Sequence, residues 1–286
     1  MESTILKYIL TEQKDIYMFI FWPIASTIDR YHEAKEEIKR QFKVRYEKTI
    51  PITRRGMKNL FFHAYRTEPW IGKPWNHFVG VGRYADKAYV ADRGAYVLWV
   101  ESSDADRVLK VKEDIREKIG IGKVSLHSTD NQEETIFLSK VLLNENSVAC
   151  LNHSRPDKYY SFFNLLQRFK CDVIEKGLNL DRIILDSEAV MSLYGVKKVR
   201  AIGFLTDYNN LKWECDQNIE NKEKDLKYYK NSIEELLYNP ENYILFDDIK
   251  FISLDVLEDF KKKRGTDRDA HDIELINKMK TSRCFY

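Results

Sequence analysis

The chain has 286 residues, of which 43% are hydrophobic and 13% aromatic, enough for one large domain or two modest ones with separate cores. Its 47 basic and 45 acidic residues leave a formal net charge of +2, so the charge requires neither a nucleic-acid nor a membrane partner. The four cysteines form no CxxC pair, which argues against a zinc knuckle or a disulfide framework and indicates free thiols. Charge appears too early for a signal peptide, and no apolar run approaches the ~20 residues of a membrane helix. We therefore expect a cytoplasmic protein without a membrane span.

Strand and helix patterns alternate through the first half of the chain. Four segments rich in apolar and β-branched residues predict strands; they are residues 16–21, 43–53, 93–102 and 123–127. Three segments with apolar residues at helical spacing predict helices; they are residues 28–42, 54–66 and the stretch that follows Asp104. This order is the split pattern of a ferredoxin-like β-α-β-β-α-β sandwich with one inserted helix. We expect an α+β fold.

The second half begins where Pro156 and polar neighbours interrupt the chain, so we expect one domain over residues 1–152 and another over 153–286. Gly177 is expected to end a long helix. The elements predicted for this half are a helix over 158–177, strands over 182–186 and 199–207 around a helix over 187–195, a hairpin over 243–254, and two closing helices.

A histidine follows the fourth predicted strand directly. Asp130 and Glu133 have the D-x-x-E spacing of a capping box, so a helix should begin just after His127. The unpaired amides of such a helix start, over residues 128–131, favour an anion. The spacing therefore predicts a phosphate-sized anion site beside His127.

Two basic residues lie just upstream, where Arg116 and Lys123 could supply counter-charge to that anion. A neutral imidazole is a competent nucleophile near pH 7, so His127 could accept a phosphoryl group or act as a general acid and base. The alternative is a hydrogen-bonded surface histidine at a strand end, next to a helix cap that has no function.

Residues 115–133, IREKIGIGKVSLHSTDNQE, resemble the nucleoside diphosphate kinase segment I-R-G-D-F…G-R-N-x-x-H-G-S-D-S-x-E. The resemblance implies that Arg116 binds phosphate and that His127 forms a phosphohistidine. It also implies a ferredoxin-like fold, and Mg²⁺ with a nucleoside triphosphate or nucleotide sugar. The stretch FIFWPIA falls at the family's first-strand I-K-P-D, which adds Trp22 to the candidates. The candidate phosphate- or nucleotide-binding residues are Arg116, Lys123, Ser128, Thr129, Asp130, Glu133 and Trp22.

Residues 183–207 resemble the start of a nucleotidyltransferase-fold domain, with Ser187 and Gly195 at matching positions. Residues 249–276 resemble the hairpin and closing K-x-x-R segment of such domains. Ala201 and Gly203 stand where that family carries its D-h-D carboxylates. The second-domain candidates for a rebuilt site are Asp186, Ser187 and Asp207, with Asp247 and Asp248 as further carboxylates. Helix caps and hairpin turns are the alternative explanation for these acids.

Two hypotheses follow. The first is a transferase that moves a phosphoryl or nucleotidyl group between small molecules, a nucleotide and a sugar or glycan precursor. The second is a catalytically degenerate nucleotide-binding or regulatory protein, because Trp22, Val124 and Leu138 stand where the kinase family has polar groups. Trp70 or Trp75 could stack on a base as part of a lid, or could pin a structural loop. A nucleic-acid partner is disfavoured. The sequence leaves the metal and the formation of a homo-oligomer undecided.

Overall fold

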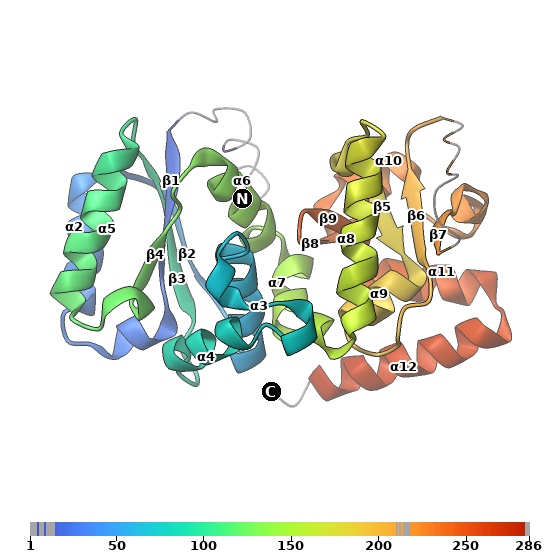
Figure 1. Cartoon of the computed structure of the whole chain (residues 1–286), viewed down its shortest axis with the longest axis horizontal. Coiled ribbons are helices and arrows are strands. Elements are labelled where there is room, and N and C mark those ends of the chain that lie inside the picture. Colours follow the sequence, from blue (N-terminus) through green and yellow to red (C-terminus); the bar gives the residue numbers. More distant parts are fainter. Residues whose placement is uncertain are drawn as a thin grey trace. The chain divides into compact units, whose positions relative to one another are not determined.

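The computed structural model describes residues 15–209 and 218–283, together with Ile5, Ile9, Leu211 and Trp213. The chain divides into two compact units (Figure 1). Unit 1 comprises Met1–Gly72 and Phe78–Leu143, and unit 2 comprises Lys73–His77 and Asn144–Tyr286. Both helix and sheet are present, as expected for an α+β protein. No helix in the described part of the chain is long and apolar enough to cross a membrane.

The division after Leu143 lies earlier in the chain than the expected boundary at residues 152 and 153. The intervening residues form helix α7 (Glu145–His153), which packs in unit 2. The Leu245 amide donates to the Ser147 hydroxyl at 2.8 Å, and the Asn144 amide group donates to the Tyr243 carbonyl at 3.3 Å. These long-range bonds fix α7 to the second sheet, which a composition change near Pro156 could not indicate.

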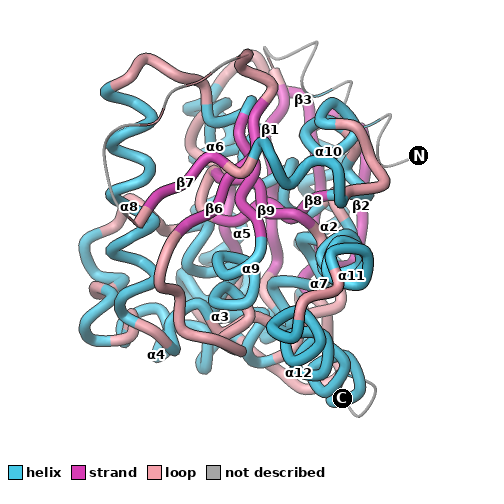
Figure 2. The backbone as a smooth tube through the Cα atoms, turned by 90° about the vertical axis from the view of Figure 1, so that its right-hand side faces the viewer, coloured by secondary structure: helices cyan, strands magenta, loops and turns pink. Residues whose placement is uncertain are grey.

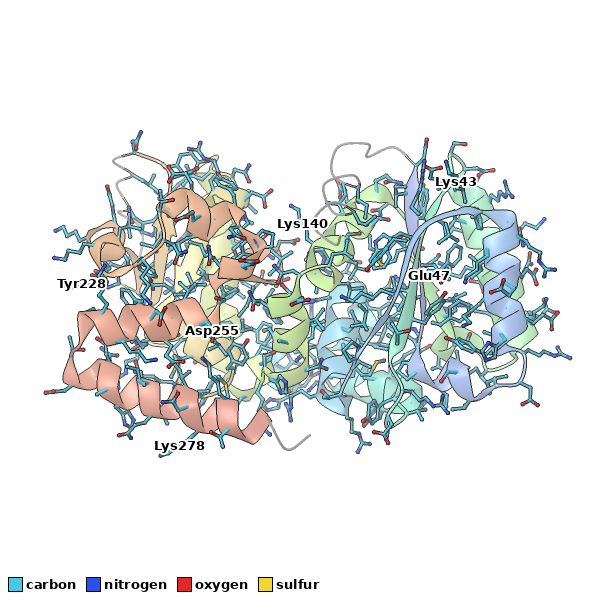
Figure 3. All side chains as sticks on the ribbon, turned by 180° about the vertical axis from the view of Figure 1, so that it is seen from behind. Lys43, Glu47, Lys140, Tyr228, Asp255 and Lys278 are labelled. Carbon is cyan, nitrogen blue, oxygen red and sulfur yellow. The ribbon has the colours of Figure 1, made fainter. Side chains whose placement is uncertain are left out.

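Unit 1 is built on a four-stranded antiparallel sheet of order β2-β3-β1-β4. Its strands are β1 (Ile16–Phe21), β2 (Lys43–Ile50), β3 (Ala95–Glu101) and β4 (Leu126–Ser128). All four correspond to predicted strands, although β4 starts later than expected because Gly122–Val124 forms a 3-10 turn. The apolar β1 lies between two partners, and the charged β2 lies at an edge with Lys43 and Glu47 at its surface (Figure 3).

Helices α2 (Tyr31–Gln41) and α5 (Ala105–Ile119) cover one face of this sheet (Figure 1). Apolar side chains from alternate strand positions, including Phe19, Phe21 and Leu126, pack against them and form a buried core. The Asp104 side chain accepts a hydrogen bond from the Arg107 amide at 3.0 Å and so caps α5, as its sequence position predicts.

The opposite face carries α3 (Arg54–Ala64), α4 (Val79–Ala88) and α6 (Gln132–Leu142) (Figure 1). Trp22 packs on Phe61 of α3 at 4.4 Å between ring centroids, and the Trp99 indole of β3 donates to Ser139 of α6 at 2.9 Å. Helix α4 lies in the segment expected to be a lid or loop. Its glycines obscured a helical spacing that nevertheless buries Val81, Ala85 and Ala88.

Unit 2 holds a mixed five-stranded sheet of order β7-β6-β5-β9-β8, with β5 parallel to β9 and β6 parallel to β7. Figure 2 shows β7, β6, β9 and β8 following one another across this sheet. The strands are β5 (Ile183–Asp186), β6 (Ile202–Thr206), β7 (Ile219–Asn221), β8 (Tyr243–Phe246) and β9 (Ile249–Ile252). Strands β8 and β9 form the predicted hairpin. Strand β7 lies in the charged region that suggested no strand.

The helices of unit 2 beyond α7 are α8 (Tyr160–Glu175), α9 (Ser187–Leu193), α10 (Ile233–Tyr238), α11 (Leu254–Arg264) and α12 (Asp267–Arg283). Phe169 of α8 packs on Phe204 of β6 at 5.6 Å, so this helix covers the sheet. Gly177 follows α8 with φ 66°, the left-handed conformation that ends a helix. The remaining 3-10 turns are Pro23–Thr27, Pro69–Ile71, Pro74–Asn76, Pro156–Lys158, Leu180–Arg182, Glu223–Tyr228 and Pro240–Asn242.

Candidate functional site

His127 lies on β4, and its side chain points to the sheet face that carries α3 and α6. Only 5% of the residue is exposed. Its Nε2 lies 2.9 Å from Glu134 Oε1, and Glu134 Oε2 accepts a hydrogen bond from the Asp130 amide at 2.7 Å. Because both carboxylate oxygens are held, Glu134 fixes the orientation of the imidazole. Nδ1 is the ring nitrogen left for chemistry.

The helix after His127 is capped one residue later than predicted. Asn131, not Asp130, is the N-cap of α6, and its side chain accepts from the Glu134 amide at 2.9 Å. The predicted capping box was therefore wrong, because the helix begins at Gln132 and the acid in its first turn that bonds back is Glu134. Glu133 is exposed.

The predicted amide donors at residues 128–131 are largely engaged within the chain. The Thr129 amide donates to the Met18 carbonyl at 3.0 Å, and the Asp130 amide donates to Glu134. Ser128 faces the other side of the sheet from His127, because adjacent strand residues alternate. Thr129 Oγ1 accepts from the Met18 amide. An anion at His127 would therefore be held by side chains and not by the start of α6.

The two basic candidates differ in placement. Arg116 is buried, and it donates from Nε and Nη2 to the Leu126 carbonyl at 3.0 and 2.8 Å and from Nη1 to Glu113 at 2.6 Å. It thus fastens the strand that carries His127. Lys123 is exposed on a 3-10 turn. A different lysine, Lys112, is buried and donates to Asp130 at 2.9 Å, so the structure supplies a cation near the helix start that the sequence alone could only suggest.

Aromatic rings form a wall beside the imidazole. Tyr65 meets His127 edge-on at 5.0 Å between ring centroids, and Trp22 lies 6.1 Å away. Trp70 contacts both Tyr65 and Tyr84 at 5.1 Å. Since Trp70 is 38% exposed, the wall extends from the surface to the buried histidine.

The electrostatics of Tyr65 suit a hydrogen-bond donor. Burial raises the pKa of its hydroxyl, and the charge of Arg116 opposes this only in part, so the hydroxyl stays protonated at neutral pH. Burial also raises the pKa of the Tyr84 hydroxyl, and the charge of Arg116 opposes this only in part. Both hydroxyls therefore lie within electrostatic reach of the guanidinium, on rings of the aromatic wall beside His127.

The loop that carries Trp70 is held tightly to α4. A Cβ atom added at Gly80 would lie 1.9 Å from the Trp70 carbonyl oxygen, so only glycine permits this approach. Trp75, the other tryptophan considered for a lid, is 69% exposed and belongs to unit 2. Of the two tryptophans considered for a lid, Trp70 is therefore the one that contacts the aromatic wall beside His127.

The acidic candidates of unit 2 do not form one cluster. Asp186 ends β5, and Asp207 follows β6 at the opposite end of the sheet, because the two strands are antiparallel and Ile183 pairs with Thr206. Asp207 accepts hydrogen bonds from Arg182 and Tyr238, each at 2.7 Å. Asp186 and Asp207 are therefore separated by the length of the strand.

The hairpin acids have structural partners. Asp247 and Asp248 form the β8–β9 turn, with φ 49° and 64°, and Asp247 accepts from Gln167 at 3.1 Å and from Lys170. Ser187 follows Asp186 with φ 42° and starts α9. In the described ranges, 15–209 and 218–283 with four further residues, no three His, Cys, Asp or Glu side chains gather in a way that could hold a metal ion.

No protein-family model matches this chain, and no curated protein or solved structure is significantly similar to it. The two family resemblances rest on the residues quoted above.

Proposed function

We propose that the chain transfers a phosphoryl or nucleotidyl group from a nucleotide to a small-molecule acceptor, such as a sugar phosphate, through His127. The observation that carries this proposal is the hydrogen bond between His127 Nε2 and Glu134. A carboxylate that accepts a hydrogen bond from Nε2–H favours the tautomer in which Nδ1 bears the lone pair. It also stabilises the positive charge that the ring gains as Nδ1 forms a bond.

In the proposed reaction, Nδ1 of His127 attacks the terminal phosphorus of a nucleoside triphosphate. The bond from phosphorus to the bridging oxygen breaks, and the nucleoside diphosphate leaves with that electron pair. An acceptor oxygen then attacks the phosphohistidine and the imidazole is restored as the leaving group. Tyr65 and the buried cations Arg116 and Lys112 would stabilise the charge on the moving group.

Mg²⁺ is the cofactor that the resemblance implies. The described residues offer it no carboxylate cluster, so we assign it no step and expect it only as the counter-ion of a bound nucleotide. The nucleobase or sugar of the donor would stack on Trp70, whose ring is partly exposed and backed by Tyr65 and Tyr84.

The fold of both units is part of the proposal. The antiparallel order β2-β3-β1-β4, with two helices between alternate strands on one face, supports a ferredoxin-like domain of the nucleoside diphosphate kinase type. For unit 2, the strand, short helix and strand around Ser187 and the closing helices support a nucleotidyltransferase-like domain. Such a domain would lack its usual acidic pair at Ala201 and Gly203.

The test is to incubate the protein with γ-labelled ATP and Mg²⁺ and to look for an acid-labile, base-stable label. We expect the label to be lost in His127→Ala and to form about 100-fold more slowly in Glu134→Gln, which removes the orienting charge. Glu133→Gln is the matched control, because Glu133 is exposed and should not affect labelling. A label that persists in His127→Ala would contradict the proposal.

A second candidate is a nucleotide-binding protein without turnover. It is favoured by the bonds of Arg116, which go to the Leu126 carbonyl and Glu113, and by the complete burial of Trp22. This candidate predicts that nucleotides or nucleotide sugars raise the melting temperature or quench tryptophan fluorescence, with no label on His127. Trp70→Ala should then abolish the fluorescence change.

A further inference from the structure

Asp186 is a buried carboxylic acid that the proposed transfer at His127 does not use. It ends β5 and is 1% exposed. Its Oδ2 accepts a hydrogen bond from the Tyr229 hydroxyl at 3.0 Å, whereas Oδ1 is buried and has no hydrogen-bond partner in the described structure. A Cβ added at Gly203, the residue opposite on β6, would lie 2.4 Å from Oδ1. The carboxyl therefore fills the space that glycine leaves, with no room on that side for a donor.

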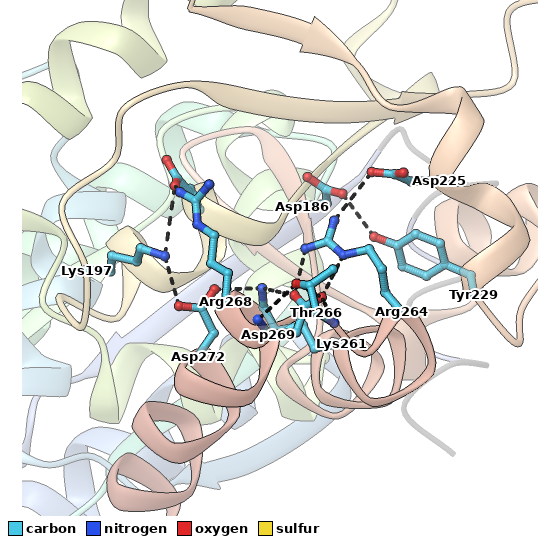
Figure 4. A network of polar contacts seen from close by, with 11 residues as sticks. Asp186, Lys197, Asp225, Tyr229, Lys261, Arg264, Thr266, Arg268, Asp269 and Asp272 are labelled. Atoms are coloured by element: carbon cyan, nitrogen blue, oxygen red, sulfur yellow. Dashed lines mark hydrogen bonds and ion pairs between the residues drawn. The ribbon is translucent and has the colours of Figure 1, made fainter.

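Asp186 bonds to Tyr229, the last residue of a short segment, residues 222–229, which we term the strap. The Lys222 amide donates to the Phe204 carbonyl at 2.8 Å, and Lys263 Nζ donates to the Tyr229 carbonyl at 3.2 Å. Tyr229 also stacks on Phe260 of α11 at 4.4 Å between ring centroids. Its hydroxyl reaches from the strap to Asp186 (Figure 4).

Charged groups surround Asp186, but each has another partner. Lys222 bonds to Glu220 at 2.5 Å, Lys261 bonds to Asp269 and Asp272, and Arg264 bonds to Asp269. Arg264 Nη1 also lies 3.6 Å from Asp225 of the strap, whose negative charge opposes ionisation of Asp186. Tyr229 is the residue that donates directly to the carboxyl, and it satisfies only one oxygen.

The balance of these effects favours the neutral acid. Burial raises the pKa of Asp186 to about 6, although the Tyr229 hydroxyl and the charge of Lys222 lower it. An ionised Asp186 would leave a charged oxygen buried without a partner, which is costly unless water enters. Water can reach Oδ1 if the strap lifts from β5 and β6.

We propose that Asp186 is a pH-sensitive latch: its protonation holds the strap against the end of β5, and its ionisation releases the strap. The inference is independent of the transfer proposed at His127. Because the acid's pKa is higher in the closed state than in the open state, closure is favoured below the open-state value and weakens as pH rises toward about 6. At neutral pH the latch is therefore weakened.

The test is amide hydrogen exchange of the whole chain between pH 4 and pH 8, expressed as protection factors so that the intrinsic pH dependence is removed. Protection of the strap amides should fall by up to roughly 100-fold across this range, since each unit of pKa difference is worth a factor of ten. Protection of residues 183–185 in β5 should change less.

Three variants make the test specific. Asp186→Asn keeps the shape and cannot ionise, so its strap should show high protection that no longer depends on pH. Tyr229→Phe removes the one donor that the described residues give to the carboxyl, and it should move the transition of the strap to higher pH. Asp255→Asn is the matched control, because Asp255 is an exposed acid of α11 and should behave as the wild type.

The outcomes separate cleanly when far-ultraviolet circular dichroism shows that each variant is folded. A pH transition in the strap that is unchanged in Asp186→Asn would overturn the latch. Equal protection of the wild-type strap at pH 4 and pH 8 would do the same. Loss of the transition in Asp186→Asn, with its retention in Asp255→Asn, would establish the latch.

Discussion

His127 of unit 1 and Asp186 of unit 2 occupy similar positions, but they differ in how many of their polar atoms have hydrogen-bond partners. Both are buried ionisable residues at strand ends, each followed by a helix. Glu134 reaches His127 and is itself held at its second oxygen by the Asp130 amide. Asp186 receives one hydrogen bond and keeps one bare oxygen. The first arrangement therefore fixes the orientation of a ring, whereas the second makes ionisation of a buried acid unfavourable.

Asp269, another buried acid of unit 2, shows how several hydrogen-bond donors affect the pKa of a carboxyl group. Asp269 is as buried as Asp186, but it accepts from Lys261, Arg264 and the Thr266 hydroxyl (Figure 4). Burial opposes its ionisation, yet the bonds from Arg264 and Thr266 and the charge of Lys261 outweigh burial and lower the pKa of Asp269. Its hydrogen-bond partners therefore keep Asp269 ionised, whereas the described residues offer Asp186 one donor.

The largest effect is expected for a variant that disrupts the ion pairs of Asp269 and Asp272 with Lys261. Lys261→Met removes a buried cation from Asp269 and Asp272, and we expect unit 2 to lose about 3–5 kcal/mol in free energy of unfolding because two buried carboxylates lose a shared cationic partner. Denaturant unfolding measures it. Lys262→Met is the control, since its exposed ion pair with Glu258 should contribute less than about 1 kcal/mol. Equal losses in the two variants would contradict the distinction.

The next effect concerns the unpaired acid. Asp186→Asn should make unit 2 more stable than the wild type by about 3 kcal/mol at pH 8, because the wild type must ionise a group whose pKa burial raises to about 6. The advantage should shrink as pH falls below about 6 and disappear near pH 4, where both side chains are neutral. Unfolding curves at several pH values measure this. A gap that does not vary with pH would show that ionisation is not the cause.

A smaller effect tests the wall beside His127. Gly80→Ala forces a methyl group against the Trp70 carbonyl, so we expect a loss of about 1–3 kcal/mol and a change in tryptophan fluorescence as the loop moves. Gly82→Ala on the same helix is the control, because its nearest neighbour would be Lys58 Cε at 3.8 Å. That variant should be neutral or more stable by up to about 1 kcal/mol.

The smallest effect concerns the helix that carries Glu134. Asn131→Ala removes the N-cap of α6 and should cost about 1 kcal/mol in the stability of unit 1, with some loss of the ordering of His127. Glu133→Ala should lower the stability of unit 1 by only a few tenths of the loss in Asn131→Ala, since Glu133 is exposed. Thermal unfolding, with the imidazole signals followed by NMR, would compare them. A larger loss in Glu133→Ala would restore the capping box expected from the sequence.

The strands and helices of unit 1 were predictable because they depend on local periodicity. The run at residues 16–21 is apolar throughout and forms the buried β1, and the spacing after Asp104 gives α5. Helix α4 was missed because Gly80 and Gly82 interrupt its helical pattern. Gly80 is needed for the close approach of the Trp70 carbonyl, a contact that the sequence does not indicate. Composition likewise could not show that α7 bonds to β8.

The sequence predicted that Arg116 lies near His127, but it did not predict the other side chains around the histidine. His127 and Arg116 do lie together, since Arg116 bonds to the carbonyl just before His127. Whether Glu133 or Glu134 bonds back to the chain before α6 depends on the residue at which α6 begins. A shift of one residue in that start exchanges the two glutamates. Tyr65 comes from another helix and carries no spacing signal relative to His127. Asp186 and Asp207 share similar contexts in the sequence, but antiparallel pairing sends them to opposite sheet ends.

The bond from Arg116 to Leu126 has a consequence for how copies of this chain behave at high concentration. Strand β4 is an edge of the first sheet, and the unpaired backbone groups of an edge can hydrogen-bond to a strand of another molecule. The guanidinium occupies a carbonyl of that edge. The other edge, β2, presents Lys43 and Arg45 in ion pairs with Glu101, which a docking strand would have to strip of water. The Arg116 bond that fastens the strand of His127 is thus also expected to disfavour addition of a strand at that edge.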